Sequence, residues 1–259
     1  MSKKYNNEKA IIAITSWKGR INTVYKTIQN LLDVCPGFHI VMTLSEEEFP
    51  NKEKDLPSNL MDISDNFEIL WVYKNWRSLK KIVFAMDKYK TLPIISADDD
   101  ALYKFNYAEV LYNTWKANPI IDRVSFISPH NNIPHGFVTE GACTLYRPNL
   151  FEKFGIAELD DSFAAPHLCD DDYYAVLCEK YKLSSVVCIN YDTSGAIHAG
   201  KKAVDDVVEW HDTENAIRDA HEAALTPNTK GTIYDYLLGV EVFCNKLLHL
   251  DIRNMLLRK

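Results

Sequence analysis

The chain contains the stretch Leu92-Pro-Ile-Ile-Ser-Ala-Asp-Asp-Asp100, in which a short apolar run ends directly in three aspartates. An apolar run of this length, bounded by polar residues, predicts a buried β-strand over residues 92–97. Residues 11–14, 38–44 and 67–73 have the same character, and the residues after the first and third of these runs have helical periodicity. This order of elements predicts an α/β fold, a mostly parallel, Rossmann-like sheet flanked by helices.

Helix and strand signals continue beyond residue 100. The first helix is expected to begin with Asn22 as its N-cap and the second with Ser78. Further elements are expected at residues 105–117, 171–181 (helices) and 124–128, 142–146, 185–190 (strands), with a helical tail from about residue 205. We therefore expect one compact domain at residues 1–204 and a helical extension at 205–259 packed on it.

Composition excludes several classes of protein. The 259 residues carry 29 basic and 36 acidic side chains, a net charge of −7, which disfavours binding to a nucleic-acid backbone. The six cysteines form no C-x-x-C pair, so neither a thiolate zinc site nor a disulfide framework is expected. No apolar run approaches the roughly 20 residues of a membrane span, and no signal peptide is recognised. We expect a cytoplasmic protein.

The trio Asp98-Asp99-Asp100 is the strongest chemical feature. Three adjacent carboxylates repel one another at the end of a buried strand, and a divalent cation such as Mg²⁺ or Mn²⁺ would relieve that repulsion. In an extended segment residues i and i+2 point the same way, so Asp98 and Asp100 would share a ligand site while Asp99 turns aside. The alternative is a solvated acidic turn at the start of the next helix.

A second trio, Asp170-Asp171-Asp172, opens the helix expected at 171–181. One of its carboxylates would act as the general base for an attacking hydroxyl, or the trio simply complements the helix dipole. His198, between glycines, becomes a candidate third metal ligand if the aspartate site exists, although a lone histidine is more often structural. Of Lys80 and Lys81, one is expected on a solvated helical face and the other in the cleft.

Motifs of rival chemistries are absent from the sequence. It contains no G-x-G-x-x-G, no P-loop signature, no G-x-S-x-G and no H-E-x-x-H. The sequence therefore does not favour dinucleotide oxidoreduction, P-loop hydrolysis, serine hydrolysis or zinc proteolysis.

Three segments resemble a group of bacterial GT-A-type glycosyltransferases. Ile11-Ile-Ala-Ile-Thr-Ser-Trp-Lys-Gly-Arg-Ile21 resembles their opening segment, and residues 78–82 with 92–103 resemble their lysine-bearing helix and DXD strand. Leu168-Cys-Asp-Asp-Asp-Tyr-Tyr-Ala-Val-Leu177 resembles the acidic pair that opens their acceptor-side helix. The resemblance covers about residues 10–200 and implies a GT-A-like fold.

The same resemblance implies the roles of individual residues. Thr15, Arg20, Lys81, Asp98 and Asp99 would bind the nucleotide-sugar, Asp98 and Asp100 would bind the metal, and Asp172 or Asp171 would be the base. Two departures from the family pattern matter. The DXD is a full Asp-Asp-Asp, which leaves the ligating pair open, and the residues after His198 do not match the pattern of some retaining enzymes. Inversion is therefore favoured.

These observations predict a metal-dependent glycosyltransferase of the hexosyltransferase class, acting in polysaccharide or lipooligosaccharide synthesis with Mn²⁺ or Mg²⁺. A UDP-sugar would be the donor and a glycan or lipid-linked saccharide the acceptor. The alternatives are a nucleotidyltransferase and an inactive carbohydrate-binding protein of the same fold. The apolar and basic residues of 247–259 suit peripheral contact with the inner face of the membrane, packing on the domain, or packing on a second subunit in a homo-oligomer.

Overall fold

The computed structural model describes residues 8–126 and 143–150 and, in short pieces, residues 181, 183–187, 190–191, 197–198 and 208–210. The helix expected at 171–181 and most of the expected tail after residue 205 lie outside these residues. The division of the chain at residue 204 stays a prediction.

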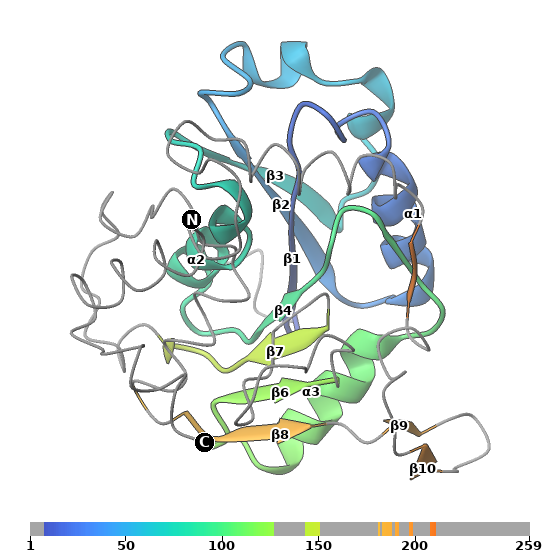
Figure 1. Cartoon of the computed structure of the whole chain (residues 1–259), viewed down its shortest axis with the longest axis vertical. Helices are drawn as coiled ribbons and strands as arrows, with labels where there is room; N and C mark the ends of the chain where they lie inside the picture. Colours follow the sequence, from blue (N-terminus) through green and yellow to red (C-terminus); the bar gives the residue numbers. More distant parts are fainter. Residues whose placement is uncertain are drawn as a thin grey trace, which may run out of the picture.

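A seven-stranded sheet forms the centre of the described structure (Figure 1). The strand order is β3-β2-β1-β4-β7-β6-β8. The first four strands run parallel, β7 runs antiparallel to both of its neighbours, and β8 is parallel to β6. The bounds are β1 Ile11–Thr15, β2 His39–Ser45, β3 Phe67–Val72, β4 Ile94–Ser96, β6 Arg123–Ser125, β7 Thr144–Tyr146 and β8 Ser185–Val187. The mostly parallel sheet predicted from the sequence is confirmed.

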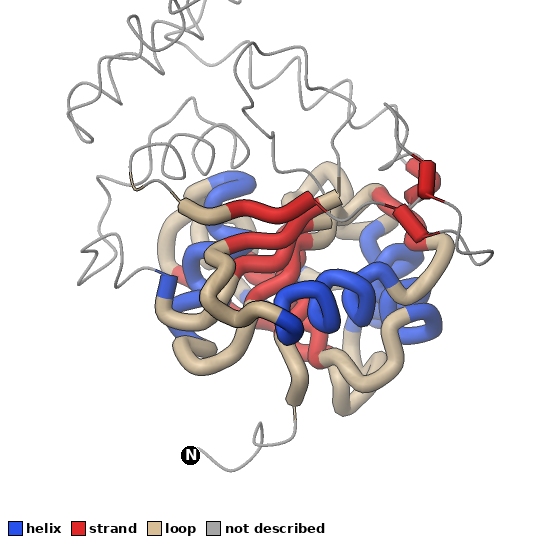
Figure 2. Tube along the Cα trace, turned by 90° about the horizontal axis from the view of Figure 1, so that it is seen from below, coloured by secondary structure: helices blue, strands red, loops and turns tan. Residues whose placement is uncertain are grey.

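Helices cover both faces of this sheet, as Figures 1 and 2 show. Helix α2 (Lys80–Lys88) packs on β1, β2 and β4. Helices α1 (Val24–Val34) and α3 (Tyr107–Ala117) lie on the other side of the sheet. Short 3₁₀ turns occupy Lys52–Asp55 (η1), Ser58–Leu60 (η2) and Arg77–Leu79 (η3). The predicted α/β class with helices on both faces is confirmed.

The apolar run of β1 is continuous because that strand is buried on both faces. Ile11, Ile12, Ala13 and Ile14 are all fully buried. Alternate residues of a strand point to opposite faces, and Ile12 and Ile14 belong to one core cluster with α1. β1 is thus an inner strand of the sheet, covered on both faces.

Both predicted helix caps are wrong. Helix α1 begins at Val24 after Thr23, because the preceding residues form a tight turn in which the amides of Arg20 and Ile21 both donate to the carbonyl of Trp17. Helix α2 follows directly on η3, so Ser78 lies inside a 3₁₀ turn and Leu79 occupies the N-cap position. In both places a tight turn precedes the helix, and the spacing of apolar residues does not reveal such a turn.

Two small antiparallel pairs lie outside the main sheet. β5 (Ala101–Tyr103), directly after the acidic trio, pairs with β11 (Val208–Trp210). β9 (Asn190–Tyr191) pairs with β10 (Ile197–His198). The expectation of helix from about residue 205 is therefore wrong at residues 208–210, because their backbone completes a pair with β5. None of the helices in the described part of the chain has the length and apolar character that crossing a bilayer requires.

Candidate functional site

The site lies where the order of the parallel strands reverses. From β1 the chain continues through β2 to β3 on one side, whereas β4 joins β1 on the other side. In open α/β sheets such a reversal opens a crevice at the carboxyl ends of the strands, where ligands bind. Thr15 and Ser16 end and follow β1, and the acidic trio follows β4. The two segments singled out in the sequence therefore meet at this crevice.

Arg20 joins two members of the acidic trio. Its Nη1 lies 2.6 Å from Oδ1 of Asp99, and its Nη2 lies 3.1 Å from Oδ2 of Asp100. The chain turns at Asp99 and Asp100 instead of staying extended, so the alternation assumed for Asp98 and Asp100 does not apply. The carboxylates brought together by one guanidinium are those of Asp99 and Asp100.

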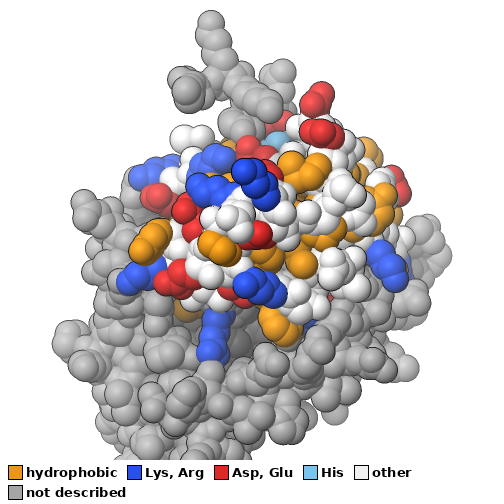
Figure 3. All heavy atoms as spheres, turned by 90° about the horizontal axis from the view of Figure 1, so that it is seen from above, with side chains coloured by type: hydrophobic (Ala, Val, Ile, Leu, Met, Phe, Trp, Pro, Cys, Tyr) orange, Lys and Arg blue, Asp and Glu red, His pale blue; other side chains and the backbone are white. Residues whose placement is uncertain are grey.

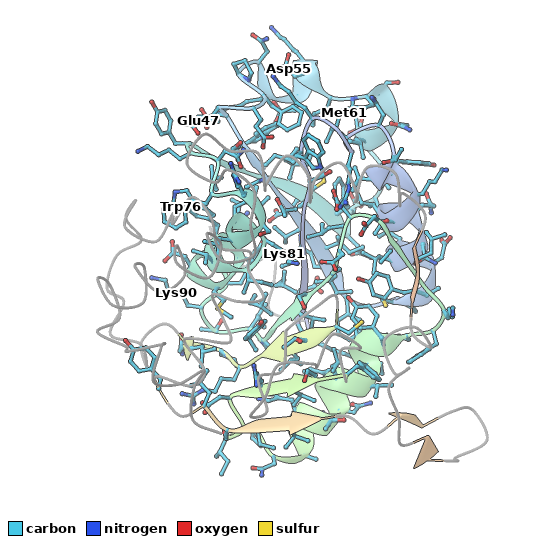
Figure 4. All side chains as sticks on the ribbon, in the orientation of Figure 1. Glu47, Asp55, Met61, Trp76, Lys81 and Lys90 are labelled. Atoms are coloured by element: carbon cyan, nitrogen blue, oxygen red, sulfur yellow. The ribbon has the colours of Figure 1, made fainter. Side chains whose placement is uncertain are left out.

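Lys81 holds the third carboxylate. Its Nζ lies 2.8 Å from Oδ1 of Asp98. Lys81 belongs to α2, and its side chain is buried. Figure 4 shows Lys81 on the side of α2 that faces the central strands, whereas Lys90 lies on the outer side beyond that helix. Asp98 is the most exposed of the three aspartates, with 26% of its side chain accessible. Its Oδ2 has no hydrogen-bond or ion-pair partner among the described residues.

The expectation that one of the two neighbouring lysines is solvated is wrong. Lys80 is as buried as Lys81. Its Nζ donates to Oδ1 of Asn75 at 3.1 Å and lies 3.6 Å from Oε2 of Glu48. A buried ammonium needs a charge partner, and Glu48 supplies it from the loop after β2.

Further polar side chains fix the acidic segment on α1 and the loop before it. Ser16 Oγ donates to Oδ2 of Asp99 at 2.7 Å, and Thr27 Oγ1 donates to the carbonyl of Asp99 at 3.0 Å. Asn30 receives a hydrogen bond from the amide of Tyr103 at 2.6 Å and donates to the carbonyl of Tyr103 at 3.1 Å. Sequence reasoning missed these residues. The signal was present: Thr27 and Asn30 are polar residues three apart, next to the buried Val24, Ile28 and Leu31 of α1.

Two stacked tyrosines support the segment from the other side. The rings of Tyr103 and Tyr107 lie 4.3 Å apart and nearly parallel. The amide of Asp98 donates to Oη of Tyr103 at 3.0 Å, and Oη of Tyr107 donates to the carbonyl of Ser96 at 3.1 Å. Burial raises the pKa of both phenols well above the ordinary value, so both stay neutral. The aspartates are thus held through side chain and backbone.

Burial changes the acidity of the trio. It raises the pKa of Asp100 to about 7, helped by the negative charge of Asp98 and opposed by Arg20. It also raises the pKa of Asp99, against the lowering effects of Arg20 and Ser16. A nearby positive charge would favour the ionised form of Asp100.

The residues present fit a divalent cation. Three carboxylates face the two positive charges of Arg20 and Lys81, and their oxygens are the hard ligands that Mn²⁺ and Mg²⁺ prefer. In the described part of the chain no three His, Cys, Asp or Glu side chains form a complete metal-binding group. One or two carboxylates completed by substrate phosphates are the usual arrangement for Mg²⁺ in phosphate-binding sites. Asp98 and Asp100 match that arrangement.

The other predicted site residues are only partly placed. Thr15 ends β1 at the crevice and its Oγ1 donates to the carbonyl of Thr43 at 2.7 Å. His198 belongs to β10, and its side chain lies outside the described residues. Asp171 and Asp172 also lie outside them. The structure therefore brings together Thr15, Arg20, Lys81 and the first acidic trio.

No family model matches the chain. No curated protein matches it either. Among solved structures, the chain is similar to the mannosyltransferase PcManGT from Pyrobaculum calidifontis in complex with GDP-Man and Mn²⁺, with a TM-score of 0.43 and 12% identity over 95% of this chain and 82% of that one. It is also similar to 4-diphosphocytidyl-2C-methyl-D-erythritol synthase, with a TM-score of 0.46 and 11% identity over 76% of this chain and 97% of that one. Both TM-scores lie below 0.5, and neither likeness assigns a function to this chain.

Proposed function

We propose that the protein is a metal-dependent glycosyltransferase that moves a sugar from a UDP-sugar to a glycan or lipid-linked acceptor with inversion. One observation carries the proposal. Carboxylates that suit a metal ion and cationic side chains that suit phosphate groups meet at the crevice of the sheet. Asp98 and Asp100 suit a divalent cation, and Arg20 and Lys81 suit a diphosphate. A nucleotide diphosphate with its metal is the ligand that needs both.

The roles follow from this arrangement. Asp98 and Asp100 would hold Mn²⁺ or Mg²⁺, with His198 as the proposed third ligand, and the cation would neutralise charge on the leaving diphosphate. Arg20 and Lys81 would bind the phosphates, and Thr15 would line the nucleotide pocket at the end of β1. Because these cationic groups are already fixed by their carboxylate partners, little reorganisation is needed when the diphosphate develops charge.

The test measures nucleotide binding and product together. Wild-type protein should be stabilised against heat by UDP in the presence of Mn²⁺, and should release UDP from a UDP-sugar when an acceptor is present. Asp100→Ala should abolish the Mn²⁺-dependent binding of UDP without unfolding the protein. Asp87→Ala, an exposed aspartate of α2, is the control and should bind UDP normally.

The same assay separates the alternatives. Release of pyrophosphate from a nucleoside triphosphate and a sugar phosphate would identify a nucleotidyltransferase. Binding without any turnover across a panel of sugars would identify an inactive carbohydrate-binding protein. Metal-dependent UDP affinity that is unchanged in Asp100→Ala would remove the metal assignment.

The proposed base is a carboxylate of the second acidic trio. An inverting transfer needs a base beside the acceptor hydroxyl, and the aspartates of the first trio are committed to cations. Asp172→Asn should lower the rate of sugar transfer by roughly 10²–10⁴-fold, the usual scale for a lost general base. Asp171→Asn tests the second candidate in the same assay. The affinity for UDP should barely change, because the base contacts the acceptor. Near wild-type transfer by both variants would place the base elsewhere or indicate retention.

A further inference from the structure

Asp99 differs from its two neighbours in what its carboxylate contacts. Oδ1 accepts from Arg20 at 2.6 Å and Oδ2 accepts from Ser16 at 2.7 Å, so both oxygens are engaged by the loop after β1. Only 7% of the residue is exposed. Asp98, by contrast, keeps an oxygen without a partner among the described residues. Asp99 is therefore the member of the trio least able to reach a ligand.

Arg20 is the side chain that these contacts fix. Its guanidinium is planar and presents two parallel N–H groups, which here bridge Asp99 and Asp100. The 2.6 Å distance to Asp99 is the shorter of the two ion-pair distances. Ser16 holds the other oxygen of Asp99, so the carboxylate cannot rotate away from Arg20 without losing that hydrogen bond.

The backbone of Asp99 is held independently of its side chain. The hydroxyl of Thr27 in α1 donates to the Asp99 carbonyl at 3.0 Å, and Thr27 is fully buried. The helix and the loop before it therefore fix the position of Asp99, and Asp99 in turn fixes Arg20. This chain of contacts runs from the core to the crevice.

We propose that Asp99 is a positioning residue, which sets the affinity of the site for a nucleotide diphosphate through Arg20 and does not bind the metal itself. This role rests on the proposed function, because it requires the diphosphate to meet Arg20. Removing the Asp99 charge removes the shorter of the two ion pairs that the Arg20 guanidinium makes with the trio, so binding must then also overcome more of the entropy cost of ordering that side chain. The metal ligands Asp98 and Asp100 keep their carboxylates.

The first experiment compares Asp99→Asn with wild type in two readouts. The Kd for UDP at saturating Mn²⁺ should rise roughly 10- to 100-fold, the scale of a lost charged hydrogen bond. The Mn²⁺ concentration that gives half-maximal UDP binding, and the free Mn²⁺ counted by electron paramagnetic resonance, should stay within about threefold. Asp100→Asn should instead shift the Mn²⁺ dependence.

The matched control is Asp122→Asn. Asp122 is also a buried aspartate, held by Arg147 Nε at 2.8 Å and by the hydroxyl of Ser184 at 3.0 Å, but it lies at the start of β6, away from the crevice. Losing this pair should lower thermal stability and leave UDP affinity unchanged. The control therefore separates the loss of a buried ion pair from the loss of Arg20 positioning.

A double-mutant cycle tests the route through Arg20. If Asp99 acts only through that side chain, Arg20→Met combined with Asp99→Asn should bind UDP no more weakly than Arg20→Met alone. Additive losses would contradict the proposal. So would wild-type UDP affinity in Asp99→Asn, or a Mn²⁺ dependence shifted as in Asp100→Asn.

A second variant decides the matter if Asp99→Asn does not fold. Thr27→Val keeps the shape of a fully buried side chain but removes its hydrogen bond to the carbonyl of Asp99. Because this buried side chain does not contact the ligand, the several-fold weaker UDP binding that we expect would act through Asp99. Thr43→Val, equally buried in β2 and without a hydroxyl partner among the described residues, should not weaken UDP binding. Unchanged binding in Thr27→Val would contradict the role of Asp99. Wild-type protein that binds no nucleotide diphosphate would contradict the proposed function and this role with it.

Discussion

Two neighbouring lysines of α2 are equally buried and yet have different partners. Lys80 pairs with Glu48 of the loop after β2 and with Asn75 of the loop after β3, whereas Lys81 pairs with Asp98 at the crevice. A buried cation whose partner is a structural loop contributes to stability. A cation paired with a half-buried carboxylate at the proposed ligand site would be available to the ligand as well. Position on the helix, one residue apart, therefore decides between the two roles.

Replacing each lysine by methionine should separate these roles. Lys80→Met removes the buried charge partner of Glu48 and one of the two donors to Asn75 Oδ1, and should lower the free energy of unfolding by about 1–3 kcal/mol, measured in urea. Lys81→Met should change stability less and raise the Kd for UDP at least about tenfold. Lys88→Met, at the more exposed end of the same helix, serves as the control for the loss of a charge. Equal losses of UDP affinity in Lys80→Met and Lys81→Met would contradict the assignment.

The thiol of Cys35, directly after α1, supplies a prediction about pH. Burial raises its pKa from the ordinary value of 9.0 to about 12. The folded protein keeps the proton where the unfolded chain releases it, so stability from this group is complete below about pH 9 and is lost between pH 9 and 12. At pH 8, iodoacetamide should modify Cys35 only after unfolding, as mass spectrometry of its peptide would show. Rapid alkylation in the folded protein would contradict this burial.

At the scale of elements, α1 holds the acidic segment through polar residues on its buried face. Asn30 donates to and accepts from the backbone of Tyr103 in β5, and Thr27 holds the carbonyl of Asp99. Backbone groups that are buried beside a helix need such partners, because water cannot reach them. The helix therefore acts as the support on which the segment from β4 to β5 is built.

Removing one support should be costly. Asn30→Leu leaves the amide and the carbonyl of Tyr103 without these partners and should lower the free energy of unfolding by about 2–4 kcal/mol, since each unsatisfied group costs about 1–3 kcal/mol. Asn113→Leu, an exposed position of α3, is the matched control and should be nearly neutral. Urea unfolding followed by circular dichroism measures both. Equal stabilities of the two variants would show that Asn30 is dispensable.

The sequence predicts most elements but not how their ends meet. Apolar runs identify β1, β2 and β4, which are buried, and β3, which is partly buried, because each run is bounded by polar residues. The pairs Arg20 with Asp99 and Lys81 with Asp98 join residues 79 and 17 positions apart, and no local pattern encodes their distances. β5 and β11 have three residues each and, unlike β4, do not lie in a longer apolar run, and their pairing depends on the tertiary structure. What was predictable is therefore the crevice and its residue types, and not the pairing.

At the scale of the whole molecule, a late part of the chain returns to the acidic segment. Val208, Glu209 and Trp210 pair with Tyr103, Leu102 and Ala101 of β5. Figure 3 shows basic and acidic side chains intermixed on the upper face of the described structure. A strand distant in sequence can therefore influence the proposed site by holding β5, which directly follows the acidic trio.

A proline in β11 tests this long-range support. Glu209→Pro removes a backbone donor and restricts the strand, whereas Glu209→Ala changes only the side chain. Glu209→Pro should reduce amide exchange protection at residues 101–103 and weaken Mn²⁺-dependent UDP binding, while Glu209→Ala should leave both unchanged. Hydrogen exchange with mass spectrometry measures the first effect. Equal protection of β5 in the two variants would show that β11 does not support the site.

The ion pairs of Arg20 and Lys81 bear on when in the life of the protein a metal enters. Because all three carboxylates of the acidic trio already pair with Arg20 or Lys81, the chain can fold before any divalent ion binds. Metal loading at the proposed site would then follow folding and would depend on which ion the cell supplies in excess and on the arrival of the nucleotide. Under the proposed function, a cell short of manganese would keep the folded protein and lose only its turnover.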